Sequence, residues 1–246
     1  MTEGPTTAAP ELEVAAEGPT SVARTPRLIA VYGQRHEPDW LVADMLTNLT
    51  PLVDGFAFVD DRARPAGEAW GHEGDFREAQ REAAIAEGAD WVLVVDPDER
   101  LEDRAAEVIR PLLGGPPTYY RFRLRELFAP NAYRVDGRWG MIRRTRLYPV
   151  QPGQVMSRKP IHTPPIPIAP ALPTVTLDLN LYHLKMIEPA NRPARGRAYA
   201  AAEIQHRAPR RAWSGLSRTL GMRLEPVPAG RGFSPAYTRP YLLGRP

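Results

Sequence analysis

The pattern of hydrophobic and polar positions points to one apolar run around which the chain is organised. Residues 91–95 read Trp-Val-Leu-Val-Val and contain no polar position that could face water. Such a run, rich in β-branched side chains, predicts a strand that is buried on both faces of an α/β sheet. Pro97 ends this strand because proline lacks the backbone donor that a sheet requires.

Other segments show the patterns of further strands. Two short apolar runs predict buried strands, and two segments of alternating character predict half-buried ones. These four strands are expected at residues 27–32, 55–59, 119–128 and 177–184. Asp136 and Gly137 form a dipeptide typical of tight hairpins, so residues 133–148 are predicted to form two strands around it.

Helices are expected where apolar residues recur at helical spacing. They are predicted at residues 38–49, 76–87, 102–113 and 188–205. Asp75 and Glu78 have the spacing of a capping box, which sets the start of the second helix at residue 76. Gly88 then ends that helix. Its buried face is predicted to be an alanine-rich stripe formed by Phe76, Ala79, Ala83 and Ala86.

The composition is that of a globular protein with one good-sized domain: 246 residues, 43% hydrophobic and 25% charged. Residues 1–26 hold hardly any large apolar side chain, so we expect a disordered leader. Residues 27–188 are predicted to form an α/β domain, and residues 189–246 a C-terminal helix followed by a tail rich in Arg and Pro. Three alternatives stay open for the tail: packing on the core, contact with an anionic membrane surface, or partial disorder.

The chain has no cysteine, which excludes disulfides, thiolate zinc sites and a thiol nucleophile. Its first residues lack the basic start and apolar core of a signal peptide, and no apolar run is long enough to span a bilayer, so we expect a soluble, cytoplasmic protein. Lys159 and Lys185 are the only lysines. The many arginines suit a phosphate-bearing ligand, although a compositional bias towards Arg, Ala and Pro across the chain accounts for most of them.

Three carboxylates, Asp96, Asp98 and Glu99, follow the central strand. The carboxyl edge of an open α/β sheet is where ligands bind, and Asp96 and Asp98 project to the same side of near-extended backbone. Two such groups can hold one hard divalent cation, Mn²⁺ or Mg²⁺. The alternative interpretation is an ordinary polar loop.

The segment Asp-Trp-Val-Leu-Val-Val-Asp-Pro-Asp-Glu-Arg-Leu, residues 90–101, resembles the metal-binding segment of family 2 glycosyltransferases. The resemblance implies a GT-A fold, which is a Rossmann-like mixed sheet with flanking helices and a β-rich acceptor half. It also implies a nucleoside-diphosphate sugar as donor, a divalent metal on the diphosphate, and transfer with inversion to an acceptor hydroxyl.

Within this resemblance, Asp60 and Asp61 after the second strand are expected to contact the nucleotide, and so is Arg81. The chain departs from the commoner Asp-x-Gly-Ser-x-Asp pattern, since residues 60–64 read Asp-Asp-Arg-Ala-Arg. For Arg81, a solvated arginine on a helix is the alternative interpretation.

A late histidine completes the metal shell of several GT-A enzymes, and His183 in the sequence Tyr-His-Leu-Lys resembles it. The alternative is a structural histidine. Glu99 and His162 are expected near the metal or the acceptor. An inverting reaction needs a base, for which Asp136 and Glu126 are candidates as acids in the acceptor half.

Two other classes remain as alternatives: a metal-dependent hydrolase or phosphotransferase that uses the same carboxylates, and a non-catalytic binding protein with the same fold. Nucleic acid is not expected as a partner because no basic stripe with interleaved aromatic residues is present. The arginines at positions 143, 144 and 146 are expected either to meet anions or to form an exposed strand face.

Overall fold

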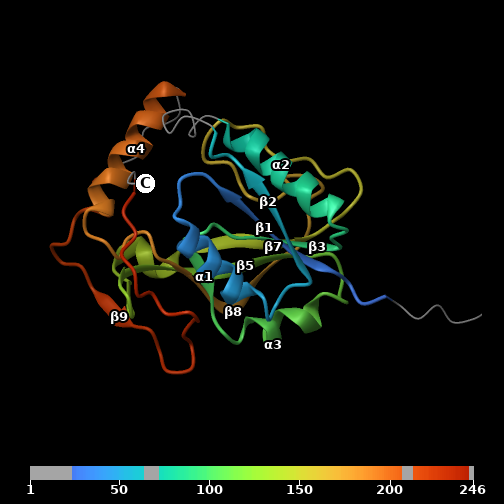
Figure 1. Ribbon diagram of the computed structural model, residues 1–246, viewed down its shortest axis with the longest axis horizontal. Helices are drawn as coiled ribbons and strands as arrows, with labels where there is room; N and C mark the ends of the chain where they lie inside the picture. Colours follow the sequence, from blue (N-terminus) through green and yellow to red (C-terminus); the bar gives the residue numbers. More distant parts are fainter. Residues whose placement is uncertain (1–23, 64–71, 207–212, 244–246) are drawn as a thin grey trace, which may run out of the picture.

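A mixed sheet of nine strands forms the centre of the computed structural model, which describes residues 24–63, 72–206 and 213–243 (Figure 1). The strands are β1 (Leu28–Gln34), β2 (Gly55–Asp60), β3 (Trp91–Val94), β4 (Glu99–Leu101), β5 (Tyr119–Ala129), β6 (Ala132–Arg134), β7 (Arg143–Pro149), β8 (Thr174–His183) and β9 (Leu224–Pro226). Strands β2, β1 and β3 are parallel neighbours, and β7 continues the sheet antiparallel to β3. The fold is therefore mixed α/β.

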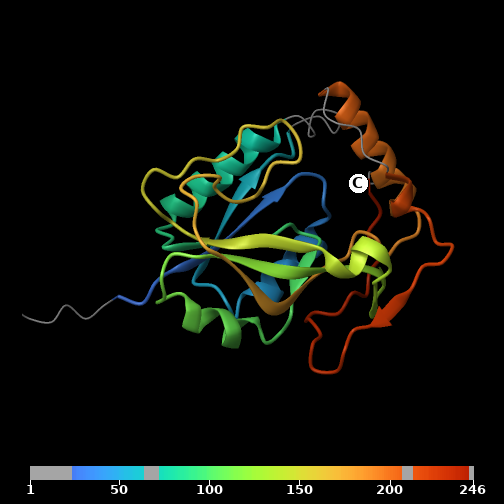
Figure 2. The same ribbon diagram turned by 180° about the vertical axis from the view of Figure 1, so that it is seen from behind.

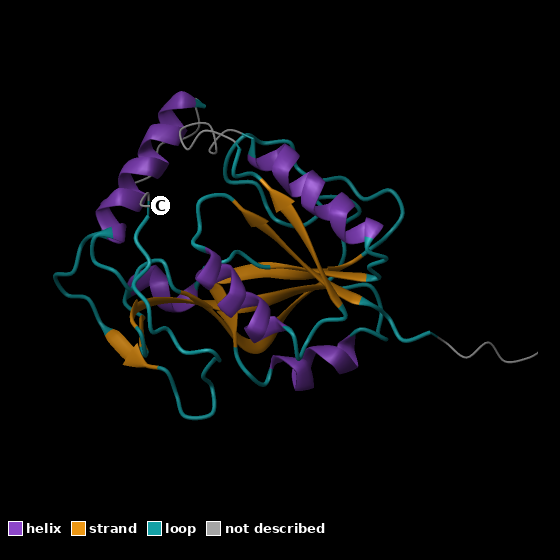
Figure 3. Ribbon diagram, in the orientation of Figure 1, coloured by secondary structure: helices purple, strands orange, loops and turns teal. Residues whose placement is uncertain are grey.

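Four α-helices and three short 3₁₀ helices accompany the sheet in the described part of the chain. They are α1 (Asp39–Leu49), α2 (Glu73–Ala86), α3 (Ala105–Ile109), α4 (Asn191–Gln205), η1 (Arg110–Leu112), η2 (Gly137–Met141) and η3 (Trp213–Leu216). Helices α1 and α3 pack on one face of the sheet and α2 lies on the other (Figure 3). Both views place α4 outside these layers (Figures 1 and 2).

The expected central strand is confirmed, because β3 begins at Trp91 and all four of its residues are buried. On one side Leu93 packs with Met45 of α1 and Ile109 of α3, and on the other Val92 packs with Ala84 of α2. Coverage on both faces explains why the sequence of this strand has no polar position.

The predicted helix over residues 102–113 is wrong in extent. Residues 99–101 form β4, which pairs antiparallel with β8 and sets Glu99 opposite His183. Only α3 and η1 follow, and Pro111 in η1 removes a backbone donor that a longer helix would need. The short strand β4 matters for function because it carries the acidic segment towards the end of β8.

The predicted hairpin around Asp136 and Gly137 is also wrong. Strand β6 pairs with β5 and β9, whereas β7 pairs with β3 and β5. Helix η2 lies between β6 and β7, and its Trp139 is buried against Phe128. Burial of this large ring competes with a tight turn at the same place.

Helix α2 begins at Glu73, three residues before the predicted start, and Asp75 does not cap it. The backbone amides of Glu73 and Gly74 instead donate to carbonyls of the proline-rich loop that joins β7 to β8, at Pro160 and Lys159. A Cβ at Gly74 would lie 2.7 Å from the backbone of that loop, so only glycine permits this contact. The buried face of α2 consists of Gly74, Arg77, Gln80 and Ala84 rather than the predicted alanine stripe.

The described part of the tail packs on the rest of the chain. Strand β9 pairs with β6, and Leu216 packs with Phe128 and Trp139. Arg231 bonds the carboxylate of Glu102 at 2.8 Å.

Most of the expected leader, residues 1–23, lies outside the described part of the chain. Among the described helices, none combines the length and the apolar character that a bilayer span requires.

Candidate functional site

A cavity of about 440 Å³ opens beside the residues that follow β3. Helix α2, strand β7, the proline-rich loop, the end of β8 and helix α4 all contribute to its walls. Among the lining residues are Arg77, Asp96, Glu99, Arg144, Arg146, His162, His183, Lys185 and Arg195. The cavity thus lies at the carboxyl edge of the parallel strands, where α/β sheets bind ligands.

Asp96, two residues after the end of β3, is held by two arginines. Its Oδ2 accepts a hydrogen bond from Arg146 at 2.9 Å, and its Oδ1 lies 3.5 Å from Arg77. Burial alone would raise the pKa of Asp96, but the charges of Arg146 and Arg77 outweigh it and hold this pKa below its usual range. Asp96 is therefore ionised at neutral pH.

Asp98, His183 and Glu126 form a buried chain of three groups. Nε2 of His183 lies 3.1 Å from Oδ2 of Asp98, and Nδ1 lies 2.8 Å from Oε2 of Glu126. Lys185 approaches the same Asp98 oxygen at 2.9 Å. Burial acts to lower the pKa of His183, but the charges of Glu126 and Asp98 raise it to about 10. Burial acts to raise the pKa of Glu126, but the charge of His183 outweighs it and lowers this pKa to about 2.

Glu99 contacts both Asp96 and the arginine that binds it, Arg146. One of its oxygens accepts a hydrogen bond from the backbone amide of Asp96 at 3.0 Å, and the other accepts one from Arg146. Burial raises the pKa of Glu99, and the nearby charge of Asp96 acts in the same direction. The pair Asp96 and Glu99 thus fixes the guanidinium of Arg146 in the cavity wall.

His162 lies in the proline-rich loop with φ of 56°, a left-handed conformation that a non-glycine residue seldom adopts. Its Nε2 lies 2.9 Å from Oε1 of Glu203, a buried carboxylate on α4. Strained backbone of this kind is often found at functional sites. His162 lines the cavity, and its closeness to an acceptor or a metal stays a prediction.

The three expected metal ligands do not assemble into one ligand group. His183 and Asp98 come together, but Asp96 faces Arg146 and Arg77. Within residues 24–63, 72–206 and 213–243, no set of three His, Asp or Glu side chains is arranged to hold a metal ion. The oxygen and imidazole donors suit Mn²⁺ or Mg²⁺ chemically, yet in this arrangement basic side chains already engage them, so the residues present do not fit the ion.

Asp60 and Asp61 lie at the end of β2, outside the lining of the cavity. Asp60 bonds the guanidinium of Arg62, two residues away, and Asp61 accepts a hydrogen bond from Arg35 at 2.9 Å. In β1, which separates β2 from β3, Gln34 pairs with Asp60. Nucleotide contact by these two acids stays a prediction.

Arg81 does not line the cavity. Its guanidinium bonds the carboxylate of Glu78 one turn earlier, at 2.6 Å. Arg77, which the sequence analysis did not single out, lines the cavity from the same helix and reaches Asp96. The signal for Arg77 was obscured because the alanine stripe suggested a different buried face.

Asp136 lies at the start of η2 and is engaged by Arg134 at 2.8 Å. The bond with Arg134 lowers the pKa of Asp136 to about 2, which makes it a weak proton acceptor. Asp136 is absent from the cavity lining, whereas Glu126 lies buried behind His183. Neither acid is therefore placed as the sequence predicts for a base that meets the acceptor.

Lys185 and Arg195 are further site residues that the sequence analysis did not assign. Lys185 follows the predicted His183 by two positions, and Arg195 projects from α4 to within 3.5 Å of Glu126. Two features of the sequence could have pointed to them: Lys185 is one of two lysines in an arginine-rich chain, and arginines recur along α4.

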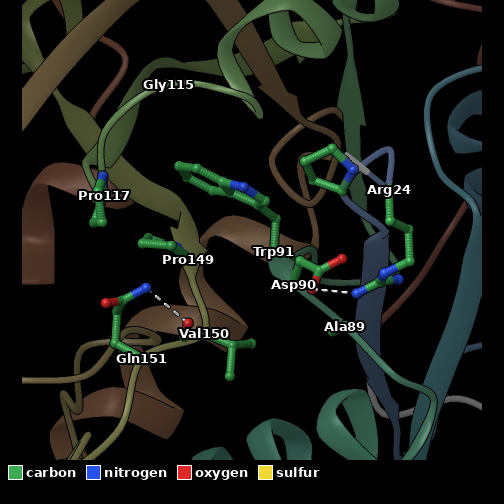
Figure 4. A pocket seen from close by; sticks show the side chains of 10 residues that line it. Arg24, Ala89, Asp90, Trp91, Gly115, Pro117, Pro149, Val150 and Gln151 are labelled. Carbon is green, nitrogen blue, oxygen red and sulfur yellow. Dashed lines mark hydrogen bonds and ion pairs between the residues drawn. The ribbon is translucent and has the colours of Figure 1, made fainter. Parts of the chain in front are cut away.

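A second cavity, of about 310 Å³, lies at the opposite end of β3 (Figure 4). Trp91 and the ion pair of Arg24 with Asp90 line it. The ring nitrogen of Trp91 donates to the carbonyl of Leu113. This cavity lies at the amino end of the strand, and its described lining holds no cluster of titratable side chains beyond that ion pair, so we do not assign it a function.

Comparison of the sequence with models of known protein families and with curated protein sequences gives no match.

Proposed function

We propose that the chain is a glycosyltransferase of the GT-A type, which moves a sugar from a nucleoside diphosphate to an acceptor hydroxyl. The observation that carries the proposal is a cavity lined by arginine and lysine at the edge of the sheet that follows β3. The order β2-β1-β3 with an acidic segment after β3 supports the same class. The proposal agrees with the resemblance of residues 90–101 to family 2 enzymes.

The cavity has the chemistry that such a donor requires. A sugar nucleotide is anionic at its diphosphate, and Arg144, Arg146 and Lys185 present positive charge to the cavity. The bond that breaks joins the anomeric carbon to a diphosphate oxygen, and the electron pair stays on that oxygen. Positive side chains fixed at this position stabilise the leaving group as its charge develops.

The acceptor oxygen forms the new bond to the anomeric carbon, and its proton must go to a base. We assign this proton to His162, because its ring lines the cavity and is held by Glu203. A neutral imidazole that donates its Nε2 hydrogen to Glu203 carries its lone pair on Nδ1. The buried carboxylate fixes the orientation of the ring and stabilises the imidazolium that forms.

The test is an assay of nucleoside-diphosphate release from UDP-, GDP- and dTDP-sugars, with a panel of hydroxyl acceptors. We expect release from one donor class to depend on an acceptor, with the sugar recovered on that acceptor. Release at the same rate without any acceptor would instead assign the chain to the hydrolases. Failure of every sugar nucleotide to bind in a thermal-shift screen would contradict the proposal altogether.

A further inference from the structure

The cavity wall is strongly basic. Six of its lining residues are arginine or lysine, namely Arg77, Arg143, Arg144, Arg146, Lys185 and Arg195. Three lining residues are acids, namely Glu73, Asp96 and Glu99. The excess of positive side chains favours an anionic ligand in this cavity.

Carboxylates, most of them buried, hold several of these basic groups in place. Asp98 bonds Lys185, Glu126 contacts Arg195, and Asp96 with Glu99 holds Arg146. The side chains of Asp98, Glu99 and Glu126 are at most 5% exposed. The cations are therefore positioned before any ligand enters, which limits the ordering that binding requires.

The same groups retain hydrogen-bonding capacity for a ligand. The Nε atoms of Arg77, Arg146 and Arg195 are buried and have no hydrogen-bond partner within the described part of the chain. Arg144 is an exposed residue that lines the cavity, and no hydrogen bond or ion pair links its side chain to another described residue. Buried donors that lack a partner call for an explanation, and a bound oxyanion supplies one.

We infer that Arg77, Arg144, Arg146 and Lys185 bind the diphosphate of the donor directly and neutralise it without a divalent cation. Arginine suits this task because its planar fork matches two phosphate oxygens, while Lys185 contributes a compact charge. Lys185 and Arg146 engage Asp98 and Asp96, the carboxylates that would otherwise hold a metal ion. The inference uses the proposed function only to identify the ligand as a diphosphate.

The experiment measures binding of inorganic pyrophosphate and of UDP to the full chain by calorimetry, first with a chelator and then with Mn²⁺. We expect binding in the chelator, with Mn²⁺ changing the Kd by less than about threefold. Arg144→Gln should raise the Kd about tenfold, which corresponds to the loss of one charge-assisted contact. The matched control is Arg239→Gln, an exposed arginine outside the cavity lining, which should leave the Kd unchanged.

Lys185→Met is the second variant, and a melting curve shows whether it folds. If Lys185→Met does not fold, Arg144→Gln still decides the test, because the side chain of Arg144 has no hydrogen bond or ion pair with a described residue to lose. Binding that appears only with Mn²⁺, or binding in chelator that Arg144→Gln leaves unchanged, would overturn the inference. Chelator-resistant pyrophosphate binding without any sugar transfer would sustain the inference and count against the proposed function alone.

Discussion

Nε2 of His183 lies 3.1 Å from Oδ2 of Asp98, although 85 positions separate the two residues. Strand β4 produces this contact, because its antiparallel pairing with β8 sets Glu99 opposite His183. The backbone amide of Leu184 donates to the carbonyl of Asp98 and closes the same link. The acidic segment after β3 is thus held against the end of β8 by backbone pairing as well as by side chains.

Replacement of Asp98 by Asn should abolish turnover and also lower stability. From the sequence alone, a change that conserves volume is expected to leave the fold intact. In the structure, however, it removes the negative charge that faces buried Lys185 and His183. We expect a loss of about 3 kcal/mol in the free energy of unfolding, as for other broken buried pairs.

Urea unfolding and an activity assay check this prediction together. The control is Asp75→Asn, whose contact with Arg158 is 3.7 Å long and mostly exposed, and which should cost less than about 0.5 kcal/mol. Wild-type stability in Asp98→Asn would show that Lys185 and His183 do not depend on this carboxylate.

Residues with strong local signals were predictable from the sequence. The strand 91–95 follows from its continuous apolar pattern, and the approach of His183 to the acidic segment follows from the family resemblance. Strand β4 was not predictable, because three residues with the sequence Glu-Arg-Leu carry no strand pattern and form one only by pairing with β8. Distant pairing of this kind leaves no mark in a local window of sequence.

The same limit explains the errors at the site. The capping box at Asp75 is a local signal, but carbonyls of a loop more than eighty positions away cap α2 in its place. That contact fixes which face of α2 is buried, and so decides that Arg77 rather than Arg81 enters the cavity. At Asp136, burial of Trp139 outweighs the turn preference of Asp-Gly.

Asp136→Asn should affect stability in a pH-dependent way while activity is retained. The bond with Arg134 lowers the pKa of Asp136 from 3.8 to about 2, so the folded state favours the ionised form. This contribution to stability is present above pH 3.8 and is lost as the pH falls through about 2. Because the side chain is partly solvated, we expect it to be below about 1 kcal/mol.

The measurement is a comparison of unfolding free energies for the wild type and Asp136→Asn from neutral to acidic pH. The difference between the two proteins should shrink as the pH falls below 3.8. A loss of turnover at neutral pH with unchanged stability would return Asp136 to the list of candidate bases.

His162→Gln should lower kcat by about a hundredfold or more, the range for removal of a general base, while donor binding stays close to that of the wild type. Glutamine can keep a hydrogen bond to Glu203 but has no basic nitrogen. Glu203→Gln should give a smaller decrease, because the imidazole remains but loses its buried carboxylate partner. His36→Gln, at an exposed position outside the cavity lining, is the matched control. Normal kcat in His162→Gln would exclude this histidine as the proton acceptor.

The sequence and the structure favour different arginines of helix α2 as ligand contacts: the sequence favours Arg81, and the structure favours Arg77. Arg77 lines the cavity and lies 3.5 Å from Asp96, whereas Arg81 is engaged by Glu78 at 2.6 Å. We therefore expect Arg77→Gln to raise the Kd for UDP about tenfold, and Arg81→Gln to change it by less than about twofold. Both substitutions remove one charge from the same helix, so effects on net charge and helix propensity cancel in the comparison.

Because the side chain of Arg77 is buried beside Gln80, melting curves of both variants are needed to separate a loss of binding from a loss of fold. The reverse ranking, with Arg81→Gln the weaker binder, would show that the nucleotide follows the position predicted from the sequence.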